Sequence, residues 1–403
     1  MNTSFLYQAF GIREQECHRC QYKDNSIVVK VQTRKEKLRC PVCGSRHVIG
    51  FGTVERQFRS VPIGSKQVWV KMKVQRIKCK DCHCVRQESI HFVTGKRSYT
   101  NRFSRYVLEL SRIGTIQDVA RFLHISWDTV KEIQKQYLRR RYSEPDISGV
   151  RCIGIDEFAV SKGNIYKTIV VDMGTGRVIY VGQGRSSDSL KGFWAKVKKQ
   201  GVKIEAVATD LSHAFISSVM NNAPDATLVF DHFHVVKLMN EAIDKLRREL
   251  YHQERDLNKR KVLQGTRWLL LCNGKDIYDE KYKSRLENAL KMNEPLAQAY
   301  YLKESLKEIW TQVTKKQAEE VLMNWIQQAK DSKLFLLKSF INTLLSHKWG
   351  ILAWYDYHIS TGKIEGINNK IKTMKRQAYG YRDQEFFILK ILALHDKNYA
   401  FSG

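Results

Sequence analysis

Proline is scarce in this chain, with only five residues among 403, and this scarcity excludes an extended proline-rich scaffold. Long apolar runs are also missing. Uninterrupted apolar stretches such as residues 268–272 are far shorter than the about 20 residues that cross a bilayer. The N-terminus has no long apolar region after a basic start, so no secretory signal is predicted. We therefore expect a cytoplasmic protein without a membrane partner.

Acidic residues are under-represented. The chain has 41 Asp+Glu against 69 Lys+Arg, a formal net charge of +28 and a pI near 9.7. The surplus is densest in residues 1–150, which hold 29 Lys+Arg and 13 Asp+Glu. Solubility alone needs much less charge, whereas neutralising phosphates releases counterions and favours binding. The composition therefore predicts a nucleic-acid partner, and at about 150 residues per domain the length predicts two or three domains.

Cysteine is nearly absent beyond residue 84, because seven of the nine cysteines precede residue 85. Cys40-Pro-Val-Cys43 and Cys79-Lys-Asp-Cys82 are C-x-x-C pairs, and thiolates at this spacing can bind one tetrahedral zinc ion from two turns of the chain. Between the pairs, apolar residues alternate over positions 68–74, a pattern typical of a strand. The sequence therefore predicts a zinc ribbon with structural zinc on Cys40, Cys43, Cys79 and Cys82.

The remaining cysteines carry no clear assignment. Cys17 and Cys20 form a third C-x-x-C pair, and Cys84 lies just after the second zinc-binding pair, Cys79 and Cys82; each zinc-binding pair with its turn is called a cysteine knuckle. The early segment does not clearly supply four ligands for a second zinc ion. These three are interpreted as spare thiols. The odd cysteine count and the lack of a secretion signal argue against a disulfide framework, and Cys152 and Cys272 fit small core positions.

Residues 101–142 carry helical periodicity, with two short helices around a tight turn within residues 115–133. Thr115 is placed to cap the first helix and Ser126 the second. The start of the second helix and the basic run after it would face DNA, as in a helix-turn-helix. The predicted DNA-binding residues are Trp127, Asp128, Thr129, Lys131, Arg139, Arg140 and Arg141. The alternative is a three-helix packing unit with a solvated polar face.

From residue 151 the pattern changes to strands that alternate with helices. The predicted strands are residues 151–155, 166–172, 177–183, 204–209 and 226–230. Helices are predicted over residues 188–199, from Ser212 and from about His234. Three strands, a helix and further strands give the order of an α/β ribonuclease H-like core.

Asp156 and Asp210 are both predicted at the carboxyl ends of strands, where open α/β sheets place their chemistry. Two carboxylates there suit magnesium, a hard cation that prefers oxygen ligands. A single aspartate at such a position is more often a helix cap. A third carboxylate, later in the chain, is therefore needed.

Residues 240–355 are polar and helical and are interpreted as an all-helical insertion into the core. The segment 363–382 holds six Lys+Arg and a single acid, Glu365. Its apolar residues recur at helical spacing, and a neighbouring polar face carries Glu365, Asn369, Lys372 and Arg376. Lys370, Lys372 and Arg376 are the predicted phosphate-binding residues. Glu365 is either the third metal ligand or a charge-balancing surface residue.

These motifs resemble the ISL-three family of bacterial insertion-sequence transposases along nearly the whole chain. The residues that carry the resemblance are the two cysteine knuckles, the helices at 115–138, Gly154-Ile-Asp156-Glu157, Thr209-Asp210, residues 230–237, residues 362–372 and Tyr379-Gly-Tyr381. The resemblance implies that Asp156, Asp210 and Glu365 form a DDE triad, with Asp231 and His234 nearby. Cys17 and Cys20 lie outside the pattern, and Thr361 stands where asparagine is common.

The sequence and its resemblance to this family together predict a multidomain DNA transposase. Its expected domains are a zinc ribbon at 1–98, a helix-turn-helix at 99–145 and a ribonuclease H-like DDE catalytic domain at 150–403. It would bind terminal inverted repeats and target DNA, work as a homodimer on DNA, and use magnesium or manganese for strand cleavage and strand transfer. The alternatives are a non-catalytic DNA-binding regulator and a structure-specific nuclease on the same core. Either way, we expect the protein to act at the bacterial nucleoid.

Overall fold

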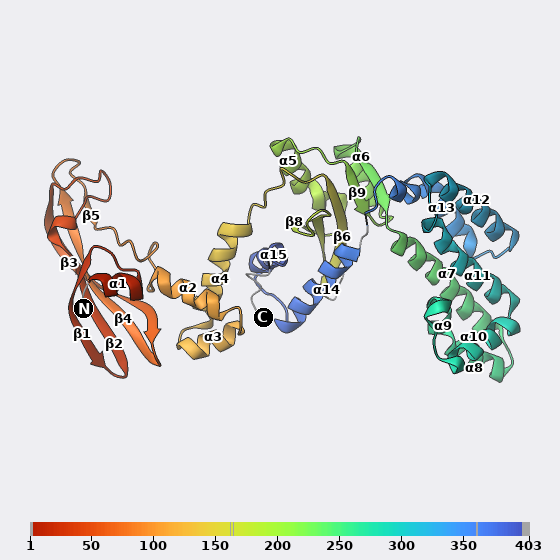
Figure 1. Ribbon diagram of the computed structural model, residues 1–403, viewed down its shortest axis with the longest axis horizontal. Coiled ribbons are helices and arrows are strands. Elements are labelled where there is room, and N and C mark those ends of the chain that lie inside the picture. Colours follow the sequence, from red (N-terminus) through yellow and green to blue (C-terminus); the bar gives the residue numbers. More distant parts are fainter. Residues whose placement is uncertain (1–2, 162, 164, 360–361, 397–403) are drawn as a thin grey trace. The chain divides into compact units, whose positions relative to one another are not determined.

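The computed structural model describes residues 3–161, 163, 165–359 and 362–396. The chain forms two compact units, the first built mainly from residues up to 140 and the second mainly from residues 141–376 and from 381 onward (Figure 1). None of the helices in the described part of the chain has the length and hydrophobicity of a membrane span.

The first unit contains a twisted five-stranded sheet in the order β1-β2-β4-β3, with β5 paired to β4. Its strands are β1 (Gln15–Lys23), β2 (Ser26–Thr33), β3 (Val48–Ile63), β4 (Lys66–Cys79) and β5 (Val85–Gln87), and helix α1 (Thr3–Phe10) precedes them. The predicted alternation is confirmed, because the apolar residues of β4 are fully buried: Val68, Val70, Met72 and Val74. The strands β3 and β4 form a long hairpin, and the two cysteine knuckles lie at its open end.

Three helices complete the first unit: α2 (Asn101–Leu110), α3 (Ile116–Leu123) and α4 (Trp127–Tyr142). Helix α3 begins with a capping box, in which the Thr115 hydroxyl accepts from the Asp118 amide at 3.2 Å and the Asp118 carboxylate accepts from the Thr115 amide at 3.0 Å. It ends at His124, whose φ of 52° turns the chain sharply. The Ser126 hydroxyl then accepts from the Thr129 amide at the start of α4. This local chemistry gives the predicted helix-turn-helix.

The second unit is built on a mixed sheet in the order β10-β9-β6-β7-β8. The strands are β6 (Cys152–Ser161), β7 (Ile165–Asp172), β8 (Val178–Gln183), β9 (Ala206–Thr209) and β10 (Thr227–Phe230). Strands β6, β7 and β8 are antiparallel, and β9 and β10 run parallel to β6. This is the ribonuclease H-like order that the sequence predicted.

One predicted strand end is wrong. Strand β6 does not end at Asp156 but continues to Ser161, because its antiparallel pairing with β7 extends past Asp156 to the pair Ser161↔Ile165. Its parallel pairing with β9, by contrast, stops at Gly154↔Ala208. Asp156 therefore lies inside one strand but just past the end of the β6–β9 ladder.

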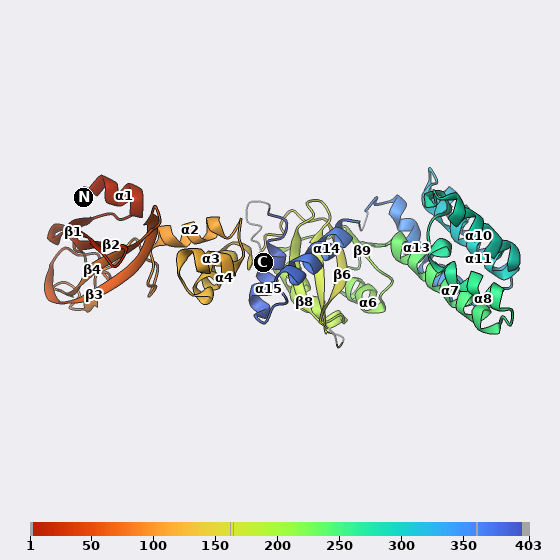
Figure 2. The same cartoon turned by 90° about the horizontal axis from the view of Figure 1, so that it is seen from below.

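Helices cover both faces of this sheet. On one face, α5 (Lys191–Gln200) and α6 (His213–Asn222) share a core with Ile153 and Ile155 of β6. On the other face lie α14 (Gly362–Gln377) and α15 (Gln384–Leu392), and the Phe387 ring of α15 is 6.2 Å from the Phe158 ring of β6. Because side chains alternate along a strand, Asp156 projects on the same side as Phe158. Figures 1 and 2 both show α14 beside β6.

The predicted helical insertion lies between β10 and α14. Its helices are α7 (His232–Gln253), α8 (Leu257–Gly265), α9 (Arg267–Leu271), α10 (Glu280–Met292), α11 (Glu294–Leu306), α12 (Lys315–Asp331) and α13 (Leu337–Leu352). Phe230, the last residue of β10, is buried in the core of the insertion. A Cβ on Gly350 of α13 would lie 2.4 Å from the Phe230 ring, so only glycine permits this close packing. The insertion is thus anchored one residue before Asp231.

Candidate active site and zinc centre

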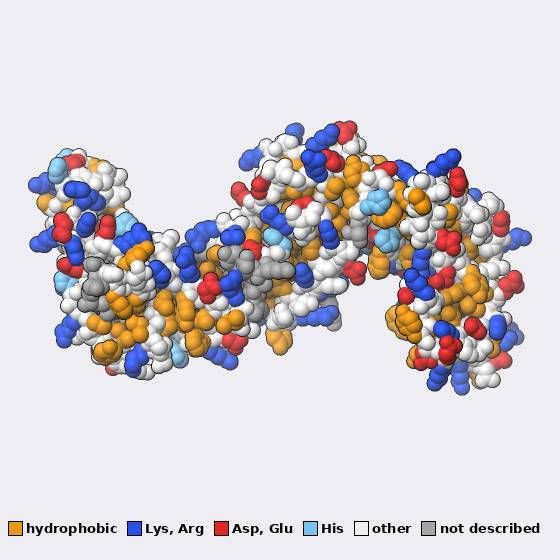
Figure 3. Space-filling view, viewed as in Figure 1, with side chains coloured by type: hydrophobic (Ala, Val, Ile, Leu, Met, Phe, Trp, Pro, Cys, Tyr) orange, Lys and Arg blue, Asp and Glu red, His pale blue; other side chains and the backbone are white. Residues whose placement is uncertain are grey.

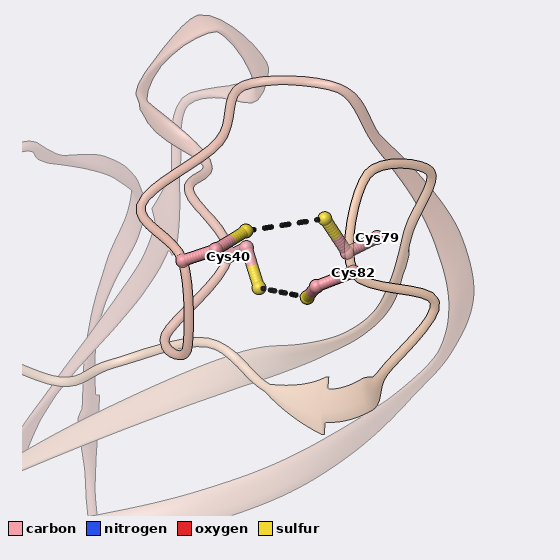
Figure 4. A group of neighbouring side chains, drawn as sticks. Cys40, Cys79 and Cys82 are labelled. Carbon is pink, nitrogen blue, oxygen red and sulfur yellow. Dashed lines mark hydrogen bonds between the residues drawn. The ribbon is translucent and has the colours of Figure 1, made fainter.

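Four thiols converge where the two cysteine knuckles meet. The sulfur atoms of Cys40, Cys43, Cys79 and Cys82 all lie within 4.8 Å of one another. The Cys40–Cys82 and Cys43–Cys79 sulfur distances are both 3.6 Å. Figure 4 shows Cys40 on one loop and Cys79 and Cys82 on the facing loop. A tetrahedral zinc ion with Zn–S bonds of about 2.3 Å places its sulfurs about 3.8 Å apart, so this donor set fits structural zinc.

The knuckle turns also lower the pKa of two of the four thiols, Cys40 and Cys79. A backbone amide hydrogen bond from Cys43 lowers the pKa of the Cys40 thiol to about 6. The corresponding amide of Cys82 lowers the pKa of the Cys79 thiol. Both effects favour the thiolate, which is the form that binds zinc. Cys40 and Cys79 are buried, whereas Cys43 and Cys82 are exposed.

Substitution of a knuckle cysteine should remove the metal. We expect the purified protein to carry about one tightly bound zinc ion per chain and Cys43→Ser to lose it, because three thiolates leave the tetrahedron open. The variant should unfold the ribbon and weaken DNA binding while the second unit stays folded. Metal analysis with circular dichroism measures this, and freshly purified wild-type protein without zinc would refute the assignment.

The sheet brings Asp156 and Asp210 together. Each aspartate follows the last β6–β9 pair, Gly154↔Ala208, by two residues. Both carboxylates are half-buried, and each accepts a local backbone amide. Asp156 Oδ1 accepts from the Glu157 amide at 2.8 Å, and Asp210 Oδ1 accepts from the Ser212 amide at 3.0 Å. Two anionic side chains therefore share the edge of the sheet where β9 ends.

Helix α14 packs directly against the strand that carries Asp156. A Cβ on Gly154 would lie 2.3 Å from the Ile364 side chain, so the glycine lets the helix approach closely. One turn further along, Asn368 Nδ2 donates to Asp156 Oδ2 at 2.7 Å. Glu365 lies between these two contact residues in the first turn of α14, with its side chain exposed.

Two lysines fix α14 along the sheet. Lys363 Nζ donates to the Met173 carbonyl at 2.6 Å, and Lys375 Nζ donates to the Val160 carbonyl at 2.7 Å. These lysines are therefore engaged in holding the helix. The basic residues that the sequence predicted as phosphate ligands are all exposed on the same helix: Lys370, Lys372 and Arg376.

Burial and like charge act together at Asp156 and Glu157. Burial raises the pKa of Asp156, the nearby charge of Asp210 raises it further, and the hydrogen bonds from Glu157 and Asn368 oppose the rise. Burial and then the charges of Asp210 and Asp156 raise the pKa of Glu157 to about 7. A divalent cation would relieve this crowding of negative charge.

Asp231 and His234 lie at the start of α7, next to these acids. The buried Asp231 caps α7 by accepting from the Phe233 amide at 3.0 Å, and its other oxygen lies 2.9 Å from His234 Nδ1. The hydrogen bond with Asp231 raises the pKa of His234, burial opposes this, and the charges of Asp210 and Asp156 contribute to the rise. The helix-cap role that we considered for a strand-end aspartate thus applies to Asp231.

The carboxylates of Asp156, Asp210 and Glu365 suit a hard cation, although they lie farther apart than the four zinc-binding sulfur atoms. Among the residues that the structure describes, no three Asp, Glu or His side chains bring their metal-binding atoms within 4.8 Å of one another. Asp156, Asp210 and Glu365 therefore stand farther apart. Beside them, Asn368 Oδ1 is buried and accepts no hydrogen bond from the described residues. A hydrated cation would supply both the missing donor and the positive charge.

Sequence reasoning missed Asn368, Glu157 and the two anchoring lysines. The sequence did contain an indication of Asn368, because this polar residue lies within an apolar stripe of α14. The stripe includes Ile364, Ile367 and Ile371, all of them buried. A buried amide in such a stripe needs a hydrogen-bond partner. The anchoring lysines had no signal, since a carbonyl acceptor far away in the sequence leaves no local pattern.

In the helix-turn-helix, four of the predicted DNA-binding residues lie at the start of α4, and we call this group the reader: Trp127, Asp128, Thr129 and Lys131. Trp127 and Asp128 are exposed, while Thr129 and Lys131 are half-buried. Lys131 Nζ lies 5.5 Å from the Trp127 ring centroid. Arg139, Arg140 and Arg141 are exposed at the other end of α4, where Arg141 lies 3.5 Å from the Asp396 carboxylate. Lys and Arg side chains are scattered over the visible face of the protein (Figure 3).

A zinc ribbon, a helix-turn-helix and a ribonuclease H-like core with acids at its edge define a DDE transposase, a metal-dependent enzyme that cuts and joins DNA. Residues 153–391 match a family model of the ISL3 DDE type described as "Transposase". Residues 88–138 match the helix-turn-helix domain of transposase family ISL3, and residues 36–82 match the zinc-finger of transposase IS204/IS1001/IS1096/IS1165. The chain belongs to the ISL3 family of transposases.

Known proteins resemble the chain over most of its length. It is 35% identical over 395 residues to the transposase for insertion sequence element IS1001 of Bordetella parapertussis, covering 97% of each protein. It is 26% identical over 388 residues to the transposase for insertion sequence element IS1557 of Mycobacterium tuberculosis, covering 90% of this chain and 87% of that protein. A solved Drosophila P element transposase strand transfer complex aligns with a TM-score of 0.42 at 10% identity, covering 75% and 93% of the two chains.

Proposed function

We propose that this transposase binds the terminal inverted repeats of an insertion sequence and cuts and joins DNA at a magnesium or manganese site held by Asp156, Asp210 and Glu365. The observation that carries the proposal is the Asn368–Asp156 hydrogen bond of 2.7 Å. It ties the helix that bears Glu365 to the strand that bears Asp156, while the parallel pairing of β6 and β9 supports Asp210 as the neighbouring ligand.

The proposed chemistry is two successive transfers at phosphorus. Water attacks the phosphate at the element end, the bond to the 3′-oxygen breaks, and a free 3′-hydroxyl remains. That hydroxyl then attacks a target phosphate and displaces the target strand's 3′-oxygen, so no covalent enzyme intermediate forms. When bound, the divalent ion supplies Lewis-acid stabilisation of the attacking and leaving oxygens. The carboxylates hold the ion, and Asn368 fixes the rotamer of Asp156.

Asp231 and His234 have a supporting role in this proposal. The Asp231 carboxylate orients His234, and the negative charges of Asp156 and Asp210 favour its protonated form. A histidinium beside the two carboxylates would attract a DNA phosphate. Lys370, Lys372 and Arg376 are exposed on α14 and would hold the DNA backbone near the acids.

DNA recognition is proposed for the helix-turn-helix together with the zinc ribbon. Lys131→Ala should weaken binding to element ends and to random DNA alike, and should reduce the salt dependence by about one phosphate contact. Thr129→Val should instead change the ranking among altered end sequences, because a base-edge contact discriminates between bases. Gel-shift titrations at several salt concentrations measure both effects.

The control for these variants is Lys291→Ala, which removes an exposed lysine at the end of α10 in the helical insertion. This variant removes one positive charge, as Lys131→Ala does, but at a position outside the helix-turn-helix. If wild-type protein bound element ends and random DNA equally tightly in moderate salt, the module would not be a specific reader.

Pairing two element ends implies a homodimer on DNA, and acting on chromosomal DNA implies work in the cytoplasm at the nucleoid. The domain limits proposed from the sequence are 1–98, 99–145 and 150–403, with the insertion at about 240–355. The decisive experiment incubates the protein with labelled element-end DNA and magnesium and scores nicking and joining. A DNA-binding regulator would give neither product, and a structure-specific nuclease would nick without joining.

A further inference from the structure

A fifth cysteine lies at the zinc centre. Cys84 Sγ is 3.4 Å from Cys40 Sγ and 3.3 Å from Cys82 Sγ. These distances are as short as those between the members of the four-thiol cluster, for which Cys40–Cys82 is 3.6 Å. Cys84 is thus in contact with two of the four proposed zinc ligands, and the spare-thiol interpretation does not account for this contact.

The fold holds Cys84 in this position through the backbone. Strand β5 pairs with β4 up to Lys78↔Val85, and the next pair along the ladder places Cys84 across from Cys79. The Cys79 amide donates to the Cys84 carbonyl at 3.0 Å. Between Cys82 and Cys84, His83 has a φ of 56°, and this left-handed residue turns the chain back toward the cluster.

Burial distinguishes the ligands of the second knuckle. Cys79 is buried and forms part of the β4 ladder, whereas Cys82 is exposed in the loop that follows. Cys84 is half-buried and is held by strand pairing on its other side. Of the two ligands in the second knuckle, Cys82 is therefore the one that can leave with less disturbance, and Cys84 is the thiol that adjoins it.

We propose that Cys84 is an alternate zinc ligand that can replace Cys82, so that five thiols serve four coordination positions. In the exchange, the Cys84 thiol loses a proton to solvent as its sulfur binds zinc, and the departing Cys82 thiolate takes up a proton. The number of thiolates on the ion and the charge of the site stay the same, and no oxidant is needed. The second knuckle can then open, or lose Cys82 to a thiol reagent, while the ribbon keeps its metal.

The test compares zinc retention in the full-length protein. Variants Cys82→Ser, Cys84→Ser and the double variant are titrated with a chromogenic chelator, and their cobalt-substituted forms are examined by absorption spectroscopy. Cys82→Ser should keep about one zinc with an affinity lowered by about tenfold, and its cobalt spectrum should retain four-thiolate intensity. Cys84→Ser should behave like wild type, and the double variant should bind zinc at least about a thousandfold more weakly.

Two controls define the comparison. Cys17→Ser/Cys20→Ser removes two thiols of β1 outside the four-thiol cluster and should change nothing, whereas Cys43→Ser, whose position is not in the exchange, should lose zinc like the double variant. The proposal is overturned if Cys82→Ser alone loses zinc as completely as the double variant, or if its cobalt spectrum shows only three thiolates. The readout is metal binding, so it is independent of whether the acidic site catalyses transposition.

Discussion

Glu365→Gln should lower both cleavage and joining of element-end DNA by about a thousandfold or more, while folding and end binding stay near the wild-type level. Glutamine keeps the shape and hydrogen-bonding capacity of glutamate but lacks the charge that holds a divalent ion. Glu365 is exposed in the first turn of α14, so the substitution should not disturb the packing of Ile364 or Asn368. A loss of activity would thus report on chemistry and not on the fold.

The matched control is Glu294→Gln, which changes an exposed glutamate in the first turn of α11 in the insertion. It should cleave and join like wild type. Single-turnover assays with labelled ends and magnesium measure the rates. If Glu365→Gln cleaved at close to the wild-type rate, Glu365 would be the charge-balancing surface residue, and the third acid would have to be sought elsewhere, with Glu157 the first candidate.

Asp156→Asn is the second substitution with a large expected effect, and it should separate activity from stability. Asparagine cannot hold the ion as a carboxylate does, so cleavage and joining should fall by about a thousandfold. Burial and the charge of Asp210 both raise the pKa of Asp156, which means that the folded protein disfavours its ionised form. Removal of that charge should leave the thermal unfolding midpoint unchanged or higher.

Asp210→Asn should be equally inactive, and combining either aspartate variant with Glu365→Gln should cost little more than the single change, because one metal site fails as a unit. Calorimetry and single-turnover assays give the two readouts. An Asp156→Asn protein that unfolds at a clearly lower temperature would indicate a structural role for this carboxylate. Additive losses in the double variants would indicate that the acids act separately.

The parts of the fold that follow local rules were predictable. Alternating apolar residues located β4, and the capping residues Thr115 and Ser126 located the helices of the reader module. The end of β6 was not predictable, because its pairing with β7, and not its own sequence, carries the strand past Asp156. The parallel pairing of β2 with β4 likewise joins segments that no local pattern connects.

The residues of the candidate sites also differ in whether the sequence could predict them. The residue types and strand positions of Asp156 and Asp210 predict a metal site from the sequence alone, whereas the role of Asn368 depends on a helix that follows the whole insertion. Cys84 shows the same limit. Its spacing from Cys82 suggested nothing, and its contact with Cys40 appears only when β5 pairs with β4.

Helix α14 is synthesised long after Asp156, and if Glu365 is the third acid, this delay determines when the enzyme becomes competent during its synthesis. At about 5–20 residues per second, the ribosome adds Glu365 roughly ten to forty seconds after Asp156. Until then the nascent chain has both aspartates and the DNA-binding module but neither the helix that packs on Gly154 nor the third acid. With the roles proposed here, a chain that terminates before residue 362 would occupy element ends without cutting them. Premature termination would then yield a competitor of the full-length transposase rather than a weak version of it.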